Sequence, residues 1–137
     1  MEILQHSIAG LPAFALYFAS SLCLLVIFLA IYIMITPYRE MTLIREGNAA
    51  AAASLSGSVL GFVIPLAHSV AQSANLADMI LWGVIALVVQ LFVFFVTTRF
   101  VIPGIGRDIP AGKVAPGVFL GALSLGTGIL NAACMTY

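Results

Sequence analysis

The sequence has few charged residues. Five basic and five acidic residues occur in 137, so 7% of the chain is charged, whereas soluble domains carry about 25%. Ten charges cannot cover the surface of a soluble globule of this size, so most of the surface must face a lipid bilayer. The formal net charge is zero, which argues against a nucleic-acid partner, because nucleic-acid binding needs a basic patch or stripe.

Cysteine is scarce too, and basic residues are missing from the N-terminal stretch. Cys23 and Cys134 lie at different depths of two apolar runs, so they do not indicate a disulfide framework. No Lys or Arg precedes the first apolar run, which extends for 25 residues from Leu11 to Ile35. Because a cleavable signal has a basic start and a short apolar core, we predict that this run is an uncleaved membrane span.

Motifs for catalysis are also missing. The sequence has no His, Cys, Asp and Glu cluster with metal-ligand spacing, no phosphate-binding loop and no nucleophile elbow. We therefore predict no catalytic residue, cofactor or metal ion, and we expect the protein not to be an enzyme. No charged residue lies clearly inside an apolar run, which argues against a proton-driven carrier but remains compatible with a channel lined by backbone or small residues.

What the chain does have is apolar sequence, which makes up 63% of its residues. Crossing a bilayer takes about 20 consecutive apolar residues, and four runs meet this length. They are Leu11–Ile35, which Pro37 stops, Ala49–Ala71, Ala77–Thr98 and Ala115–Met135. The prediction is an all-α integral membrane protein of four transmembrane helices in one membrane domain, residues 1–137.

All five basic residues fall in two places. Arg39 and Arg45 lie between the first and second runs, and Arg99, Arg107 and Lys113 lie at or between the third and fourth. The positive-inside rule places both basic connections in the cytoplasm and both termini outside it. Together with Glu40, Glu46 and Asp108, which are the acidic residues of these connections, we expect a weakly positive inner face that contacts anionic lipid or an acidic partner.

An internal repeat follows the same division. Residues 47–67 align with residues 112–132 at an offset of 65, with seven identities in 21 positions. Each half has a bulky span, a basic connection with proline and a span rich in small residues. We predict two tandem two-helix repeats, 11–71 and 77–135, related by an axis along the membrane normal.

The second and fourth runs carry small residues at helical spacing. These are Gly57 and Gly61 in the second run and Gly117, Gly121 and Gly128 in the fourth. Small residues let helix backbones approach closely in a membrane, where burial of apolar surface does not drive helix association. We expect these two spans to pack together at the centre of the bundle or at a subunit interface, and we expect a homo-oligomer.

A polar segment opens the second span. Asn48 is suited to cap the helix, Glu46 favours the positive end of its dipole, and Gly47 has a permissive backbone. The alternative is that Arg45, Glu46, Gly47 and Asn48 form a cytoplasmic rim that binds a cation or a protein partner. Capping is the simpler interpretation of the same residues.

Three residues of the spans, one proline and two with side-chain amides, are candidates for a local structural or functional role. Pro65 either kinks the second span or exposes carbonyl groups there. Asn131, near the outer end of the fourth span, indicates an interhelical hydrogen bond or interfacial solvation. Gln90, deep in the third span, is suited to an interhelical hydrogen bond rather than to a transport site.

Four segments as a set carry a family resemblance. These are ThrProTyr at 36–38, LeuIleArgGluGlyAsnAlaAla at 43–50, GlySerValLeuGlyPheValIlePro at 57–65 and LeuAsnAlaAlaCysMet at 130–135. The chain resembles, over nearly its whole length, domain-of-unknown-function family 350, the YjfL-type bacterial inner membrane proteins. The resemblance implies a bacterial inner (plasma) membrane location, no established activity, and a genetic context of envelope stress and polyamine metabolism. The two halves differ in one place, because Lys113 stands where the first half has Asn48.

Together these patterns predict a non-enzymatic, oligomeric structural or accessory component of the inner membrane, linked by the resemblance to envelope stress. The alternative is a small oligomeric channel or facilitator for ions or small solutes, with the second and fourth spans lining the path. An intramembrane enzyme is the weakest hypothesis, because no nucleophile–base pair or metal set is present in the sequence.

Overall fold

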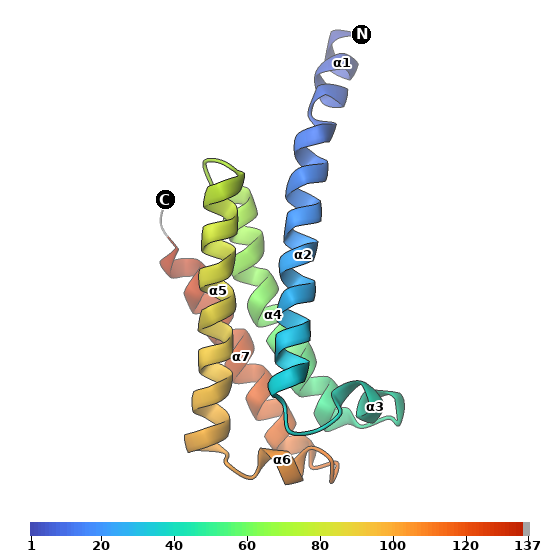
Figure 1. Ribbon diagram of the computed structural model, residues 1–137, viewed down its shortest axis with the longest axis vertical. Coiled ribbons are helices and arrows are strands. Elements are labelled where there is room, and N and C mark those ends of the chain that lie inside the picture. Colours follow the sequence, from blue (N-terminus) through green and yellow to red (C-terminus); the bar gives the residue numbers. More distant parts are fainter. Residues whose placement is uncertain (136–137) are drawn as a thin grey trace.

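The computed structural model describes residues 1–135, and helices account for nearly all of that part (Figure 1). The helices are α1 (Glu2–Ala9), α2 (Leu11–Ile35), α3 (Glu40–Arg45), α4 (Ala49–Gln72), α5 (Leu76–Val96), the π-helical turn η1 (Thr97–Val101), α6 (Ile105–Asp108) and α7 (Val114–Cys134). Within residues 1–135, four helical stretches are long and apolar enough to cross a membrane: Glu2–Ile35, Ala49–Gln72, Leu76–Val101 and Val114–Cys134.

The four predicted spans are therefore present, with small differences at their ends. The first has the predicted bounds, the second ends one residue later, and the fourth begins and ends one residue earlier. The third continues past Thr98 through η1 to Val101. The sequence prediction ended this span at the charge of Arg99, but that side chain is exposed at the surface, so helical backbone can pass through the position without burying a charge.

The four long helices form one bundle in which neighbours along the chain run in opposite directions (Figure 1). The connections that contain α3 and α6 lie at one end, which we call the loop end. The turn between α4 and α5, the N-terminus and the end of α7 point the other way. Helices α4 and α7 have the most extensive contact, α5 packs against both, and α2 packs against α4 and α5. The start of the first span, α1 and the first turns of α2, extends beyond the bundle.

Helices α4 and α7 touch backbone to backbone through glycine. A Cβ atom at Gly57 would overlap the backbone of Gly121, and one at Gly128 would lie 2.5 Å from Cα of Gly61. Gly117 lies in the same way against the backbone of Ala50. This close packing is how small residues hold helices together in a membrane, and it leaves no space for a side chain at these glycines.

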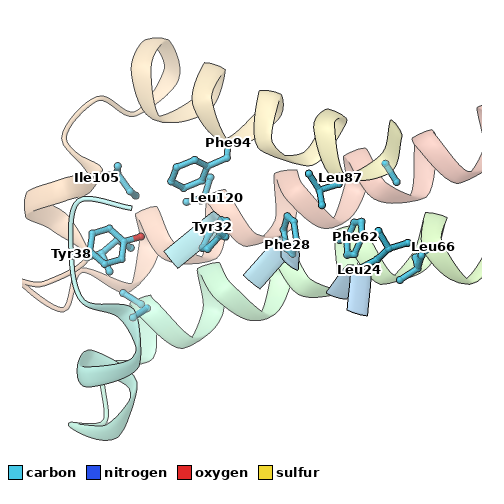
Figure 2. Packing of buried hydrophobic residues seen from close by; sticks show 14 residues of the cluster. Leu24, Phe28, Tyr32, Tyr38, Phe62, Leu66, Leu87, Phe94, Ile105 and Leu120 are labelled. Atoms are coloured by element: carbon cyan, nitrogen blue, oxygen red, sulfur yellow. The ribbon is translucent and has the colours of Figure 1, made fainter. Parts of the chain in front are cut away.

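Aromatic rings join α2 to α4 and α5. Phe28 stacks on Phe62 of α4 with ring centroids 4.7 Å apart, and Tyr32 meets the ring of Phe94 of α5 edge-on at 4.8 Å. Figure 2 shows these rings in one row that continues to Tyr38 at the loop end. Aromatic pairs stabilise packing by about 0.5–1.5 kcal/mol beyond the area they bury, so the second half of α2 is fixed in the bundle while its first half faces outward.

Candidate functional site

The segment at the start of α4 forms a cap. Asn48 accepts a hydrogen bond from the backbone N–H of Ala51 at 2.9 Å through its side-chain oxygen, as the capping interpretation requires. Its side-chain nitrogen donates to the carbonyl of Ile109 at 2.8 Å, so the same residue ties the two loop-end connections together. Gly47 has φ of 85°, a left-handed conformation that favours glycine. Arg45 and Glu46 are exposed beside it.

Pro65 and Gln90 act together inside the bundle. Pro65 lies within α4 and has no backbone N–H, so the carbonyl of Gly61 four residues earlier loses its usual helical donor. The side-chain amide of Gln90 donates to this carbonyl at 3.0 Å and to the carbonyl of Ser124 in α7 at 2.9 Å. The predicted interhelical hydrogen bond of Gln90 is confirmed, and it joins three helices. The carbonyl that Pro65 frees is therefore already paired within the protein.

Asn131 lies in the last turns of α7 and is partly buried. Its side-chain nitrogen is buried, and no hydrogen-bond partner for it occurs among residues 1–135. The interhelical hydrogen bond expected for Asn131 therefore does not form through this nitrogen within the described residues.

The position of Glu40 differs from the sequence prediction. The prediction counted Glu40 among the surface acids of the inner face, yet its side chain is completely buried, with 0% exposure. The reason is that α3 folds back against α4 and carries its first residue, Glu40, into the bundle. Burial raises the pKa of Glu40 to about 8, although the nearby hydroxyls of Tyr38 and Ser54 favour the charged form and oppose this shift.

A sequence signal for this burial existed but was weak. Ser54 and Ser58 are spaced by four on α4, so they share one face of the helix, and both are buried. Burial raises the pKa of Tyr38 as well, with a further contribution from the charge of Glu40. The serine pair indicated that the second span has a polar face, but only the fold of α3 showed that a carboxyl group lies close to it.

The exposed surface of the loop end is more basic than predicted. Five basic residues, Arg39, Arg45, Arg99, Arg107 and Lys113, are exposed, whereas the acidic side chains outside the core are Glu46 and the half-buried Asp108. The net charge of these side chains at the loop end is therefore +3. One ion pair is present in the described part of the chain, between Lys113 and Asp108 at 3.5 Å.

Comparison of the sequence with known proteins places this chain in a family. Residues 6–135 match the family described as Domain of Unknown Function (DUF350). The inner membrane protein YjfL of Escherichia coli strain K12, of the group UPF0719, is 42% identical over 133 residues, which cover 97% of this chain and 100% of the relative. The transmembrane protein YshE of Bacillus subtilis strain 168, also of UPF0719, is 32% identical over 123 residues, or 87% of this chain and 90% of the relative.

The chain belongs to the DUF350 family. The resemblance drawn from the sequence is confirmed, and with it the location of this DUF350 protein as a multi-pass protein of the inner membrane. The names of the relatives state no activity. No solved structure matches the chain.

The chemistry open to the described residues is narrow. Among residues 1–135, no three His, Cys, Asp or Glu side chains lie close enough together to hold a metal ion. Cys23 and Cys134 are both free and exposed. The chemically distinctive features are thus the buried carboxyl of Glu40, the paired amide of Gln90 and the basic loop end.

Proposed function

We propose that this DUF350 protein is a non-enzymatic structural or accessory component of the inner membrane that acts as an oligomer. One observation favours the accessory role over a channel. The α4–α7 contact, where the sequence analysis placed the path of a channel, is closed by direct backbone contact between glycines. Since Gln90 also occupies the carbonyl beside Pro65, a single chain offers no lined path along this contact.

The loop end supplies a surface for partners. In our proposal the two basic connections lie in the cytoplasm and both termini lie outside it, as the positive-inside rule requires. The +3 balance of exposed charge would then attract anionic lipid headgroups or an acidic cytoplasmic protein, with a strength that falls as salt concentration rises. Arg45 and Glu46 belong to this exposed rim.

Tandem duplication is part of the same proposal, and the two connections support it. Gly47 and Gly112, which the offset of 65 relates, both have positive φ, at 85° and 79°. The N–H of Gly47 donates to the carbonyl of Ile44 and that of Gly112 to the carbonyl of Ile109, each at 3.0 Å. The donors of the two bonds, and likewise their acceptors, are 65 residues apart, which is the offset of the repeat. Equivalent turns before α4 and α7 would set two small-residue helices parallel and in contact.

A small oligomeric channel is the second candidate. Because the α4–α7 contact is closed, a path would have to lie between subunits, lined by the outer faces of the helices. Purified protein in liposomes separates the two candidates. We expect efflux of K⁺, Na⁺ and a small neutral solute to equal that of empty liposomes, while native mass measurement in nanodiscs shows an oligomer. Solute efflux that scales with the amount of protein would overturn the accessory role, and a monomer at every concentration would overturn the oligomer.

A further inference from the structure

The loop end of the bundle holds a group of buried oxygen atoms. Both carboxyl oxygens of Glu40 and the hydroxyls of Tyr32 and Tyr38 are buried, and within residues 1–135 none of the four is in regular hydrogen-bond geometry with a partner. The hydroxyls of Tyr38 and Ser54 are nevertheless close enough to Glu40 to favour its charged form. Glu40 and Tyr32 have 0% and 1% exposure. Figure 2 shows Tyr38 at the loop end and Tyr32 as the next ring along the core. Buried polar atoms in proteins almost always have a partner, so four such oxygens in one place are unusual.

The helices around Glu40 bring oxygen atoms to it but no positive charge. On α4, Ser54 and Ser58 are buried, and their hydroxyls donate to the carbonyl of Ala51 at 3.3 Å and to the hydroxyl of Ser124 at 3.4 Å. The adjoining α6 contributes the apolar Ile105 to the buried hydrophobic cluster that also contains Tyr32 and Tyr38. The titratable groups near the carboxyl are thus the two tyrosines, which are neutral at physiological pH.

The basic residues on either side of Glu40 point away from this core. Arg39 precedes Glu40 and Arg45 ends α3, yet both are exposed. In the described part of the chain the one ion pair joins Lys113 to Asp108, not a base to Glu40. An ionised carboxylate buried without a counter-ion is highly unfavourable, and such a group takes up a proton or binds a cation instead. The raised pKa of Glu40 agrees with this argument.

The carboxyl also lies beside a route to solvent. An open hollow of about 350 Å³ borders α3 at the loop end, and it is lined by Thr36, Pro37, Tyr38, Arg39 and Glu40 together with Ile33, Met41 and Thr42. A small ion could reach Glu40 from this hollow with a local movement of α3, which is only six residues long. A large organic ligand could not, because the side chain itself is fully covered.

We propose that Glu40, Tyr32 and Tyr38 form a buried binding site for one monovalent cation, either a proton or a small alkali metal ion such as Na⁺. With a proton bound, the carboxyl is neutral and needs no counter-ion. With an alkali ion bound, the carboxylate neutralises the charge and the hydroxyls supply the oxygen ligands that hard cations prefer. This inference goes beyond the accessory role and does not rest on it.

Infrared spectroscopy of the full chain in nanodiscs tests the site directly, because protonated and ionised carboxyl groups absorb at different frequencies. In choline chloride we expect a protonated carboxyl band at neutral pH that disappears as the pH rises, with a midpoint of about 8. Glu40→Gln should abolish the band. This variant should still fold, because the glutamine amide has the shape of the neutral acid. Glu46→Gln, which changes an exposed acid six residues away, should leave the band unchanged.

Two further arms identify the occupant and the role of the tyrosine. If replacing choline by Na⁺ moves the midpoint to lower pH, an alkali ion shares the site, and if it does not, the occupant is a proton. Tyr38→Phe should move the midpoint to higher pH, because the Tyr38 hydroxyl favours the ionised carboxyl. A protonated band that persists in Glu40→Gln would overturn the proposal, and so would the lack of a protonated carboxyl in the unaltered protein in choline chloride at neutral pH.

Discussion

We expect the contributions of Pro65 and Gln90 to the stability of the protein to be coupled, because both residues act on the carbonyl group of Gly61. Pro65 removes the N–H that would pair with the carbonyl of Gly61, and Gln90 donates to that carbonyl from a neighbouring helix at 3.0 Å. Gln90→Met keeps the length of the side chain but removes both of its donors. Pro65→Ala returns a backbone N–H to α4. The two substitutions and their combination form a double-mutant cycle around one carbonyl group.

The magnitudes follow from the two hydrogen bonds of Gln90. Losing the bond to Ser124 removes an interhelical hydrogen bond, typically worth about 0.6 kcal/mol in a membrane protein. Losing the bond to Gly61 leaves a buried acceptor without any donor, at a cost of about 1–3 kcal/mol. Gln90→Met should therefore destabilise the protein by about 2–3 kcal/mol. In a protein that carries Pro65→Ala, the restored N–H pairs with the carbonyl of Gly61. In that background Gln90→Met should therefore cost only about 1 kcal/mol.

Reversible unfolding in mixed micelles, followed by circular dichroism as the SDS fraction rises, measures these free energies. We expect a coupling of about 1–2 kcal/mol between the two sites. If Gln90→Met has the same cost with and without Pro65, the carbonyl of Gly61 does not depend on Gln90, and the reasoning fails.

Three other tests address packing, burial and topology. Gly128→Ala should destabilise the bundle by about 1–3 kcal/mol, because its Cβ would collide with the backbone of Gly61, whereas Gly126→Ala meets nothing within 4 Å and should be neutral or stabilising; equal melting of the two variants would contradict the glycine contact. The pKa of Glu40 rises on folding from 4.5 to about 8, so the unfolded chain releases this proton first and stability should fall as pH rises through that window, by at most about 1.4 kcal/mol per unit; a slope in SDS unfolding that survives Glu40→Gln would exclude Glu40 as its source. In cells whose protein lacks the two native cysteines, Asn75→Cys should react with an impermeant thiol reagent and Arg107→Cys should not; the reverse labelling pattern would invert the proposed topology.

The sequence was sufficient for the elements themselves. Each span is a long apolar run, and a helix is the simplest structure that satisfies every backbone group in lipid without a partner. For this reason α2, α4 and α7 have bounds within one residue of those predicted. The cap at Asn48 was predictable for the same reason, since a capping bond involves residues three apart in the chain. The small-residue spacing of α4 and α7 likewise indicated helices that could approach closely.

Tertiary structure decided the properties that depend on distant residues. Nothing in the order of residues shows that Gln90 reaches the carbonyl freed by Pro65, because the two residues lie on different helices and meet only when α5 packs against α4. Glu40 looked like a surface acid because it lies in the connection after a span and stands beside Arg39. Its burial comes from the way α3 folds against α4, and a charge pattern along the chain carries no information about that fold. The length of the apolar runs thus indicated which segments can cross the membrane, while packing between segments decided which polar groups lie inside the bundle and which partners they have.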